Sequence, residues 1–146
     1  MKSKQLYLIL GAAILVTVIV AVALIATRPS TSSTTAASAF DPSSGVISPA
    51  AYTTEFVDSG RQHFLLDVRT PGEYDGGHIA NSANISVETL AGQLAQVPTD
   101  QPIIVYCRSG NRSAQAAAIL RQAGYTQVYD LGGVIQWEAE GYPLIQ

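Results

Sequence analysis

Residues 102–123 read PIIVYCRSGNRSAQAAAILRQA, and this run contains the only cysteine of the 146-residue chain. The apolar, largely β-branched residues 102–106 are typical of a buried strand. The alanine-rich residues 113–123, followed by Gly124, predict a helix and its C-terminal end. Cys107 therefore lies in a short loop that connects a strand to the N-terminus of a helix.

This position favours a negatively charged sulfur. The unpaired amides and the positive dipole end of a helix N-terminus attract an anion, and Arg108 and Arg112 flank the thiol in the same loop. We expect both influences to lower the pKa of Cys107 below the free value of about 8.5 and to leave a reactive thiolate. A small buried structural cysteine is the common alternative, but that role does not require two arginines, Gly110 and Asn111 as neighbours.

The residues on either side of this loop alternate between predicted strands and helices. Besides 102–106, strands are predicted at residues 46–47, 63–68, 83–85 and 127–130; helices are predicted at 48–58, 87–95, 113–123 and 134–140. Residues 70–77 have turn composition with room for one helical turn. This alternation predicts an α/β fold with a mostly parallel sheet of four or five strands flanked by helices.

The charge and the cysteine count exclude several functions for the part from residue 45 onward. Its ten acidic residues and five arginines give a net charge near −5, whereas a nucleic-acid-binding domain needs a basic face. A single cysteine cannot form an internal disulfide, and no histidines or cysteines have the spacing of metal ligands. We therefore predict no metal and no cofactor.

The N-terminal part of the chain differs in composition. Residues 6–26 are 21 uncharged and mostly apolar residues, enough for a helix to cross a hydrocarbon core of roughly 30 Å. We predict a transmembrane helix there, after a cytoplasmic N-terminus at residues 1–5. A cleaved signal peptide is the alternative, although its apolar region usually spans only about 7–15 residues. Residues 27–44 are rich in Ser, Thr and Ala and predict a flexible linker.

The charges that flank this apolar segment predict its orientation. Lys2 and Lys4 precede it and only Arg28 follows it, so the positive-inside rule places the N-terminus in the cytoplasm. The chain is then a single-pass membrane protein with an extracytoplasmic globular domain. If the segment is instead cleaved, the domain is secreted.

Four motifs in this order resemble those of a rhodanese domain. They are Asp67-Val68-Arg69, the run EYDGGHIANSANI at 73–85, the run CRSGNRS at 107–113, and Gly132-Gly133 followed by Trp137 and GYPL at 141–144. The resemblance covers about residues 45–146 and implies a single rhodanese-like domain that follows the linker.

The resemblance implies sulfurtransferase activity of the thiosulfate sulfurtransferase type. Cys107 would accept sulfane sulfur from thiosulfate or a similar small donor as a persulfide, and would pass it to a thiol or another thiophilic acceptor. A membrane-tethered docking module for a protein partner and a persulfide carrier with little thiosulfate activity are the alternatives. Cysteine-loop phosphatases are a rival class, but their arginine comes six residues after the cysteine, where this chain has Ser113.

The predicted site residues fall into three groups. Cys107 is the predicted nucleophile. The loop that would bind the donor comprises Arg108, Ser109, Gly110, Asn111 and Arg112, and the residues expected to support the loop are Asp67, Arg69 and Ser113. Because displacement by a thiolate needs no general acid, we expect Asp67 to brace the loop rather than to catalyse. We expect structural roles for His63, His78 and Trp137 as well.

Overall fold

A four-stranded, fully parallel sheet forms the centre of the domain in the computed structural model, which describes residues 45–146. The strand order is β2-β1-β3-β4. The strands are β1 (Phe64–Asp67), β2 (Ser82–Asn84), β3 (Ile103–Cys107) and β4 (Val128–Gly133). The predicted α/β class and parallel sheet are therefore confirmed, with four strands.

Two isolated β-bridges lie outside the pairing of the four strands. Val46 forms a single parallel bridge with Asp130 beside β4, so the strand predicted at residues 46–47 is one isolated bridge. His78 and Ile145 form an antiparallel bridge, with backbone hydrogen bonds of 2.8 Å in both directions. This second pairing ties the C-terminal residues to the loop that precedes β2.

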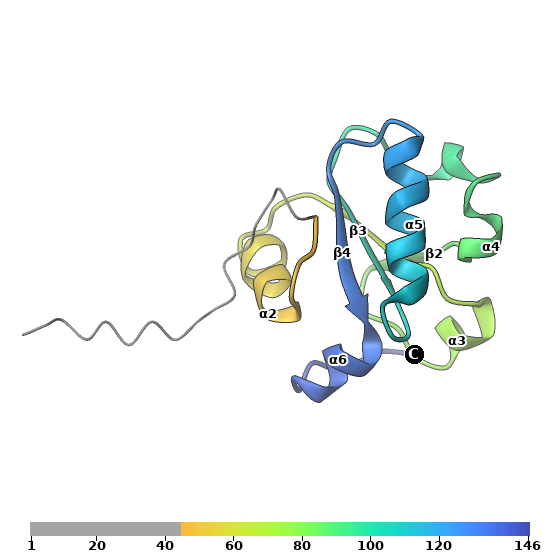
Figure 1. Cartoon of the computed structure of the whole chain (residues 1–146). Coiled ribbons are helices and arrows are strands. Elements are labelled where there is room, and N and C mark those ends of the chain that lie inside the picture. Colours follow the sequence, from red (N-terminus) through yellow and green to blue (C-terminus); the bar gives the residue numbers. More distant parts are fainter. Residues whose placement is uncertain (1–44) are drawn as a thin grey trace, which may run out of the picture. The chain divides into compact units, whose positions relative to one another are not determined.

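Helices cover both faces of the sheet (Figure 1). One face carries α4 (Val87–Leu90) and α5 (Asn111–Gln122); the other carries α2 (Pro49–Tyr52), the π-helix η1 (Thr53–Asp58) and α6 (Val134–Ala139). The short helices α3 (Pro71–Asp75) and η2 (Leu94–Gln96) lie in the connections. All five residues of β3 are buried, as expected for a central strand of a sheet covered on both sides.

Alternate residues of β3 point into two separate cores. Val105 and Cys107 belong to the core beneath α5, together with Leu120. Ile104 and Tyr106 belong to the core on the opposite face. Because successive side chains of a strand point to opposite faces, the thiol lies on the α5 side of the sheet.

The first helices begin where the sequence predicts. Ser48 caps α2 by accepting a 3.2 Å hydrogen bond from the Ala51 amide, with Pro49 at the first helical position. Thr70 and Glu73 form a reciprocal capping box at α3, which turns the predicted helical turn at 70–77 into a five-residue helix.

Two predicted elements have the wrong limits. The helix predicted at 87–95 ends at Leu90 and is followed by the separate η2, with the break around Gly92, a residue of low helix propensity. Strand β4 continues through Gly132 and Gly133, beyond residue 130, where we expect the strand to end. The register between β3 and β4 shifts at the Val105–Tyr106 step of β3. Gly132, which pairs with Tyr106, has a φ of 82°, a conformation that glycine adopts easily, so β4 can continue past the shift.

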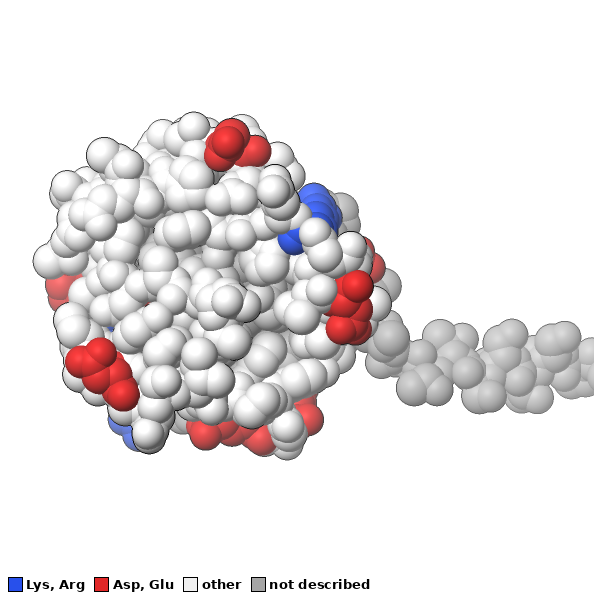
Figure 2. Space-filling model, turned by 180° about the vertical axis from the view of Figure 1, so that it is seen from behind, with Lys and Arg blue, Asp and Glu red and all other residues white. Residues whose placement is uncertain are grey.

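Charged residues are dispersed on the surface of the domain. On the side seen in Figure 2 most of the surface is uncharged, and Asp and Glu side chains lie in separate groups near its outline. Within residues 45–146 no helix has both the length and the apolar character needed to cross a bilayer. The predicted N-terminus, membrane span and linker at residues 1–44 lie outside the described residues.

Candidate active site

The Cys107 loop lies beyond the C-terminal end of β3. Ligands of open parallel sheets bind at this edge, where the strands end. Strand β1 ends nearby at Asp67, which pairs in register with Tyr106, and β4 ends at Gly133, which pairs with Cys107. The predicted nucleophile therefore lies where the fold places binding sites.

The sulfur of Cys107 is enclosed by the backbone of its own loop. The residue is only 1% exposed. The Gly110 amide donates a hydrogen bond of 3.1 Å to Sγ, and the Ser113 hydroxyl oxygen lies 3.7 Å from Sγ. The loop thus offers hydrogen-bond donors to a sulfur atom that is shielded from water.

These contacts lower the pKa of the thiol. Burial acts to raise the pKa of Cys107, but hydrogen bonding by the amides of Ser113, Gly110 and Ser109 and by the Ser113 hydroxyl outweighs it. The direction agrees with the prediction. Of the two predicted influences, the backbone amides of the loop are the main cause that lowers the pKa.

Two glycines give the loop its shape. Gly110 forms the N-cap of α5. Its φ of 102° is a backbone conformation that residues with a side chain rarely adopt. Gly133 packs so closely against the loop that a Cβ atom there would lie 2.6 Å from the Cα of Ser109. The Ser113 hydroxyl also lies within hydrogen-bond distance of the Gly110 and Gly132 carbonyls, at 2.8 and 3.1 Å. The loop is therefore held firmly against the end of β4.

Arg112 connects the loop to α3. Its guanidinium donates two hydrogen bonds to the carboxylate of Glu73, at 2.7 and 2.8 Å. Bonding by Arg112, together with Thr70, lowers the pKa of Glu73 to about 2 despite the opposing effect of burial. Glu73 is the main cause of the raised pKa of Arg112, and the charge of Cys107 contributes as well. Arg112 therefore supplies positive potential near the sulfur while it fixes the loop.

The remaining loop residues form the outer rim of the site. Arg108, Ser109 and Asn111 are exposed. The Arg108 carbonyl accepts a 3.2 Å hydrogen bond from the Ile135 amide, which fixes the backbone next to the thiol. The guanidinium of Arg108 thus belongs to the solvent-facing side of the loop.

Asp67 and Arg69 form a buried ion pair near the site. The Asp67 carboxylate is 0% exposed and accepts bonds from the Arg69 backbone amide and guanidinium, including one of 2.8 Å from the amide. Arg69 also donates a 2.8 Å bond to the Gly77 carbonyl. The pair therefore braces the loop that follows α3, and the bonds of its side chains do not reach the Cys107 loop, where we had expected their support.

The histidines and the tryptophan have local partners. His78 stacks on Tyr74 at 3.8 Å between ring centroids, and its Nδ1 lies 3.1 Å from the Tyr74 carbonyl. His63 lies 2.9 Å from the Tyr52 hydroxyl, and Trp137 donates to the Pro143 carbonyl at 3.0 Å. In the described domain no three His, Cys, Asp or Glu side chains gather in an arrangement that could hold a metal ion.

Two residues of the site were missed by the sequence analysis. Glu73 is 39 positions from Arg112, and only its place in a Thr-x-x-Glu capping box was visible in the sequence. Gly133 follows the strand predicted at residues 127–130 and was not assigned to the site. Its close approach to the loop backbone depends on the parallel pairing of β3 and β4, which local sequence does not encode.

Several known proteins resemble this chain in sequence. The family profile described as a rhodanese-like domain matches residues 49–140. A sulfurtransferase of Allochromatium vinosum is 39% identical over 82 residues, which make up 56% of this chain and 77% of that protein. The thiosulfate sulfurtransferase GlpE of Pseudoalteromonas translucida is 37% identical over 90 residues, 61% of this chain and 85% of that protein.

Solved structures show the same fold. A rhodanese-related protein from Thermoplasma volcanium is 37% identical with a TM-score of 0.60, and the match covers 68% of this chain and 96% of that one. A rhodanese-like domain from Anabaena is 26% identical with a TM-score of 0.64, covering 73% and 80% of the two chains. The profile match spans the sheet, the Cys107 loop and the helices from α2 through α6.

Proposed function

The chain belongs to the rhodanese-like domain family, and from this premise we propose that it moves sulfane sulfur from thiosulfate or a similar donor to a thiophilic acceptor. Cys107 is the nucleophile and carries the sulfur as a persulfide. The observation that carries this proposal is the set of loop amides around a shielded thiol, which includes the 3.1 Å contact from Gly110 and lowers the pKa of that thiol. A thiolate is the reactive form of cysteine.

The reaction consists of two displacements. In the first, the Cys107 thiolate attacks the outer sulfur of thiosulfate, the S–S bond of the donor breaks, and sulfite leaves with the bonding electrons. In the second, a thiolate or cyanide acceptor attacks the terminal sulfur of the persulfide, and the Cys107 thiolate leaves. Since one product departs before the acceptor reacts, the kinetics are ping-pong.

Different residues of the loop have different roles in these two steps. The amides that favour the Cys107 thiolate also favour it as the leaving group of the second step, and they can donate to a persulfide anion or to sulfonate oxygens. Exposed Arg108 attracts an anionic donor at the rim. Arg112, paired with Glu73, keeps the loop in place and adds positive potential.

Cyanolysis with thiosulfate tests the proposal, with Cys107→Ser as the matched variant. The wild type should produce thiocyanate and the variant should not. After incubation with thiosulfate, Cys107 should carry a mass increase of about 32 Da, roughly one sulfur atom. If the wild type and the variant are equally inactive and no adduct forms with any sulfur donor, the proposal fails.

A persulfide carrier is the second candidate, and the 1% exposure of Cys107 favours it. A shielded sulfur can be loaded by a protein donor that docks on the loop while small donors react slowly. A Cys107 adduct in protein from its native source, combined with little cyanolysis, would distinguish this carrier from the thiosulfate-using enzyme.

We also propose that residues 6–26 anchor the domain in a membrane, with the domain on the extracytoplasmic side. The support is the length of the uncharged segment and the position of Lys2 and Lys4. Mass spectrometry of the mature N-terminus separates the anchor from the cleaved, secreted form. An intact N-terminus in a membrane fraction that resists alkaline extraction is the expected result.

A further inference from the structure

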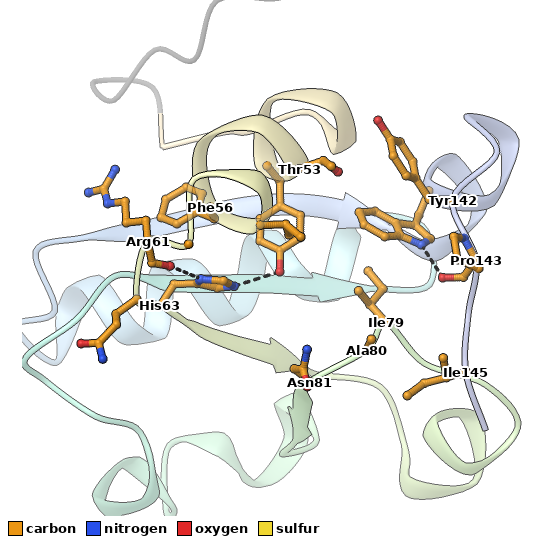
Figure 3. Close-up of a pocket in the computed structure, with 15 residues that line it drawn as sticks. Thr53, Phe56, Arg61, His63, Ile79, Ala80, Asn81, Tyr142, Pro143 and Ile145 are labelled. Carbon is orange, nitrogen blue, oxygen red and sulfur yellow. Dashed lines mark hydrogen bonds between the residues drawn. The ribbon is translucent and has the colours of Figure 1, made fainter.

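A cavity of about 520 Å³ lies on the face of the sheet opposite to the Cys107 side chain (Figure 3). Its walls include Tyr52 from α2, Phe56 from η1, Trp137 from α6, and Ile79 from the loop before β2. This volume falls within the range of small-molecule sites. Its lining includes no residue of the Cys107 loop, so the cavity is separate from the transfer site.

The aromatic wall of the cavity is fixed in advance. The ring centroid of Tyr52 lies 6.0 Å from that of Phe56 and 5.9 Å from that of Trp137. The ring centroids of Trp137 and Tyr142 are 4.6 Å apart. Tyr52, Phe56 and Trp137 are between 1% and 6% exposed. These three rings therefore form a fixed floor, and a ligand would contact mainly the more exposed Tyr142, Pro143 and Ile145 at its edge. Because the floor is already held in place, little affinity is lost to the ordering of its side chains.

The polar atoms of this wall are occupied by one another. Nδ1 of His63 lies 2.8 Å from the Arg61 carbonyl, so in the neutral ring Nε2 accepts the hydrogen bond of the Tyr52 hydroxyl. Burial raises the pKa of Tyr52 to about 12, which keeps that hydroxyl protonated. Trp137 uses its indole N–H on the Pro143 carbonyl. The wall therefore presents mainly apolar surface to a ligand.

Arg61 is the only charged residue among those that line the cavity. It is exposed, and its guanidinium carbon lies 4.8 Å from the centroid of the Phe56 ring. Figure 3 shows it at one end of the cavity, with Pro143 and Ile145 toward the other end. Within residues 45–146 the ion pairs are Asp67–Arg69 and Glu73–Arg112, so the guanidinium of Arg61 has no carboxylate partner there.

We propose that this cavity binds a small amphiphilic anion. A flat apolar body lies against the aromatic wall, and one carboxylate or similar anionic group pairs with Arg61. An uncharged ligand would gain the apolar contact alone, whereas an anion also gains charge-assisted hydrogen bonds from Arg61. The inference goes beyond sulfur transfer, because the Cys107 loop takes no part in it.

Trp137 provides a direct probe, since the chain has a single tryptophan and hence a single indole N–H resonance. We would titrate the ¹⁵N-labelled full-length protein with 2-naphthoate and, separately, with the neutral isostere 2-naphthamide. Both should shift the indole resonance in a saturable way. Naphthoate should bind about two- to fivefold more tightly, the ratio expected of a solvent-exposed ion pair.

The variants assign that preference to Arg61. Arg61→Gln should bind the two probes equally, while Arg108→Gln, which removes the same charge from the Cys107 loop, should keep the wild-type ratio. The absence of a saturable shift with both probes would overturn the proposal. So would equal wild-type affinities, or a preference that Arg108→Gln abolishes as fully as Arg61→Gln does.

Discussion

The Cys107 loop and the aromatic cavity lie on opposite faces of one sheet and use their polar groups in opposite ways. In the loop, the amides of Gly110, Ser109 and Ser113 act on one sulfur atom and lower its pKa. In the cavity, the hydroxyl of Tyr52 and the imidazole of His63 are paired with each other. Hydrogen-bond donors that point at a reactive atom indicate a catalytic site. Hydrogen-bond donors that are already paired within the cavity wall indicate a surface for apolar contact.

The largest effect should come from removing the sulfur itself. Cys107→Ala should reduce cyanolysis to the uncatalysed background, because no other thiol exists in the chain. The titration of the cavity with 2-naphthoate should be unchanged, since the two sites share no lining residue. Loss of naphthoate binding in this variant would show that the two faces are not independent.

The next largest effect should come from the buried ion pair between Asp67 and Arg69 at the end of β1. Arg69→Ala leaves the 0% exposed Asp67 without its partner, and removal of one member of a buried pair typically costs about 3–5 kcal/mol of unfolding free energy. Urea denaturation measures this loss. Exposed Arg108→Ala is the control and should change stability by about 0.5 kcal/mol or less. A loss below about 1 kcal/mol for Arg69→Ala would contradict the structural role.

A smaller and more local effect is expected at Gly133. A methyl group there would meet the backbone of Arg108 and Ser109, and overpacking of this kind costs about 1–3 kcal/mol. Gly133→Ala should therefore lower both stability and the rate of sulfur transfer. Gly60→Ala is a useful comparison, because a methyl group at Gly60 would meet no neighbouring atom. Its φ of 67° adds only some backbone strain. Equal transfer rates for wild type and Gly133→Ala would show that the loop adapts freely.

The smallest effect should be the pH dependence contributed by Glu73. Its folded pKa of about 2 lies below the ordinary value of 4.5, so the Glu73–Arg112 pair stabilises the fold fully above about pH 4.5, and this contribution is lost as the pH falls toward 2. The side chains are 30% and 27% exposed, which limits the contribution to about 1 kcal/mol or less. Glu73→Gln should remove this part of the pH dependence of urea unfolding. An identical pH profile in the variant would be the contrary result.

Local sequence was sufficient to predict most of the fold. The apolar runs predicted β1 and β3, the alanine-rich run predicted α5, and the helix predicted from residue 48 begins with Ser48 as its cap. The errors lie where tertiary pairing decides the limits. Strand β4 continues through Gly133 because β3 supplies its partners, and the helix predicted at 87–95 divides around Gly92.

The candidate site was less predictable than the fold. The sequence identified the thiol, the direction of its pKa shift and the contribution of backbone amides, but it gave equal weight to two arginines, one of which is bound to Glu73. That contact joins residues 39 positions apart, so no local pattern reveals it. The cavity was missed because Trp137 was interpreted only as a core residue, and a core residue that also lines an opening has the same local sequence signature.

The pKa of the Cys107 thiol tests the central claim most directly. Absorbance of the thiolate near 240 nm is followed from about pH 5 to 10 as the difference between wild type and Cys107→Ser. This difference reports the one cysteine, because the seven tyrosines, which also absorb there when they ionise, are common to both proteins. The enclosing amides predict a midpoint below the value of about 8.5 for free cysteine, and Ser113→Ala should raise it. A wild-type midpoint at or above about 8.5 would contradict the claim that this loop prepares a thiolate for sulfur transfer.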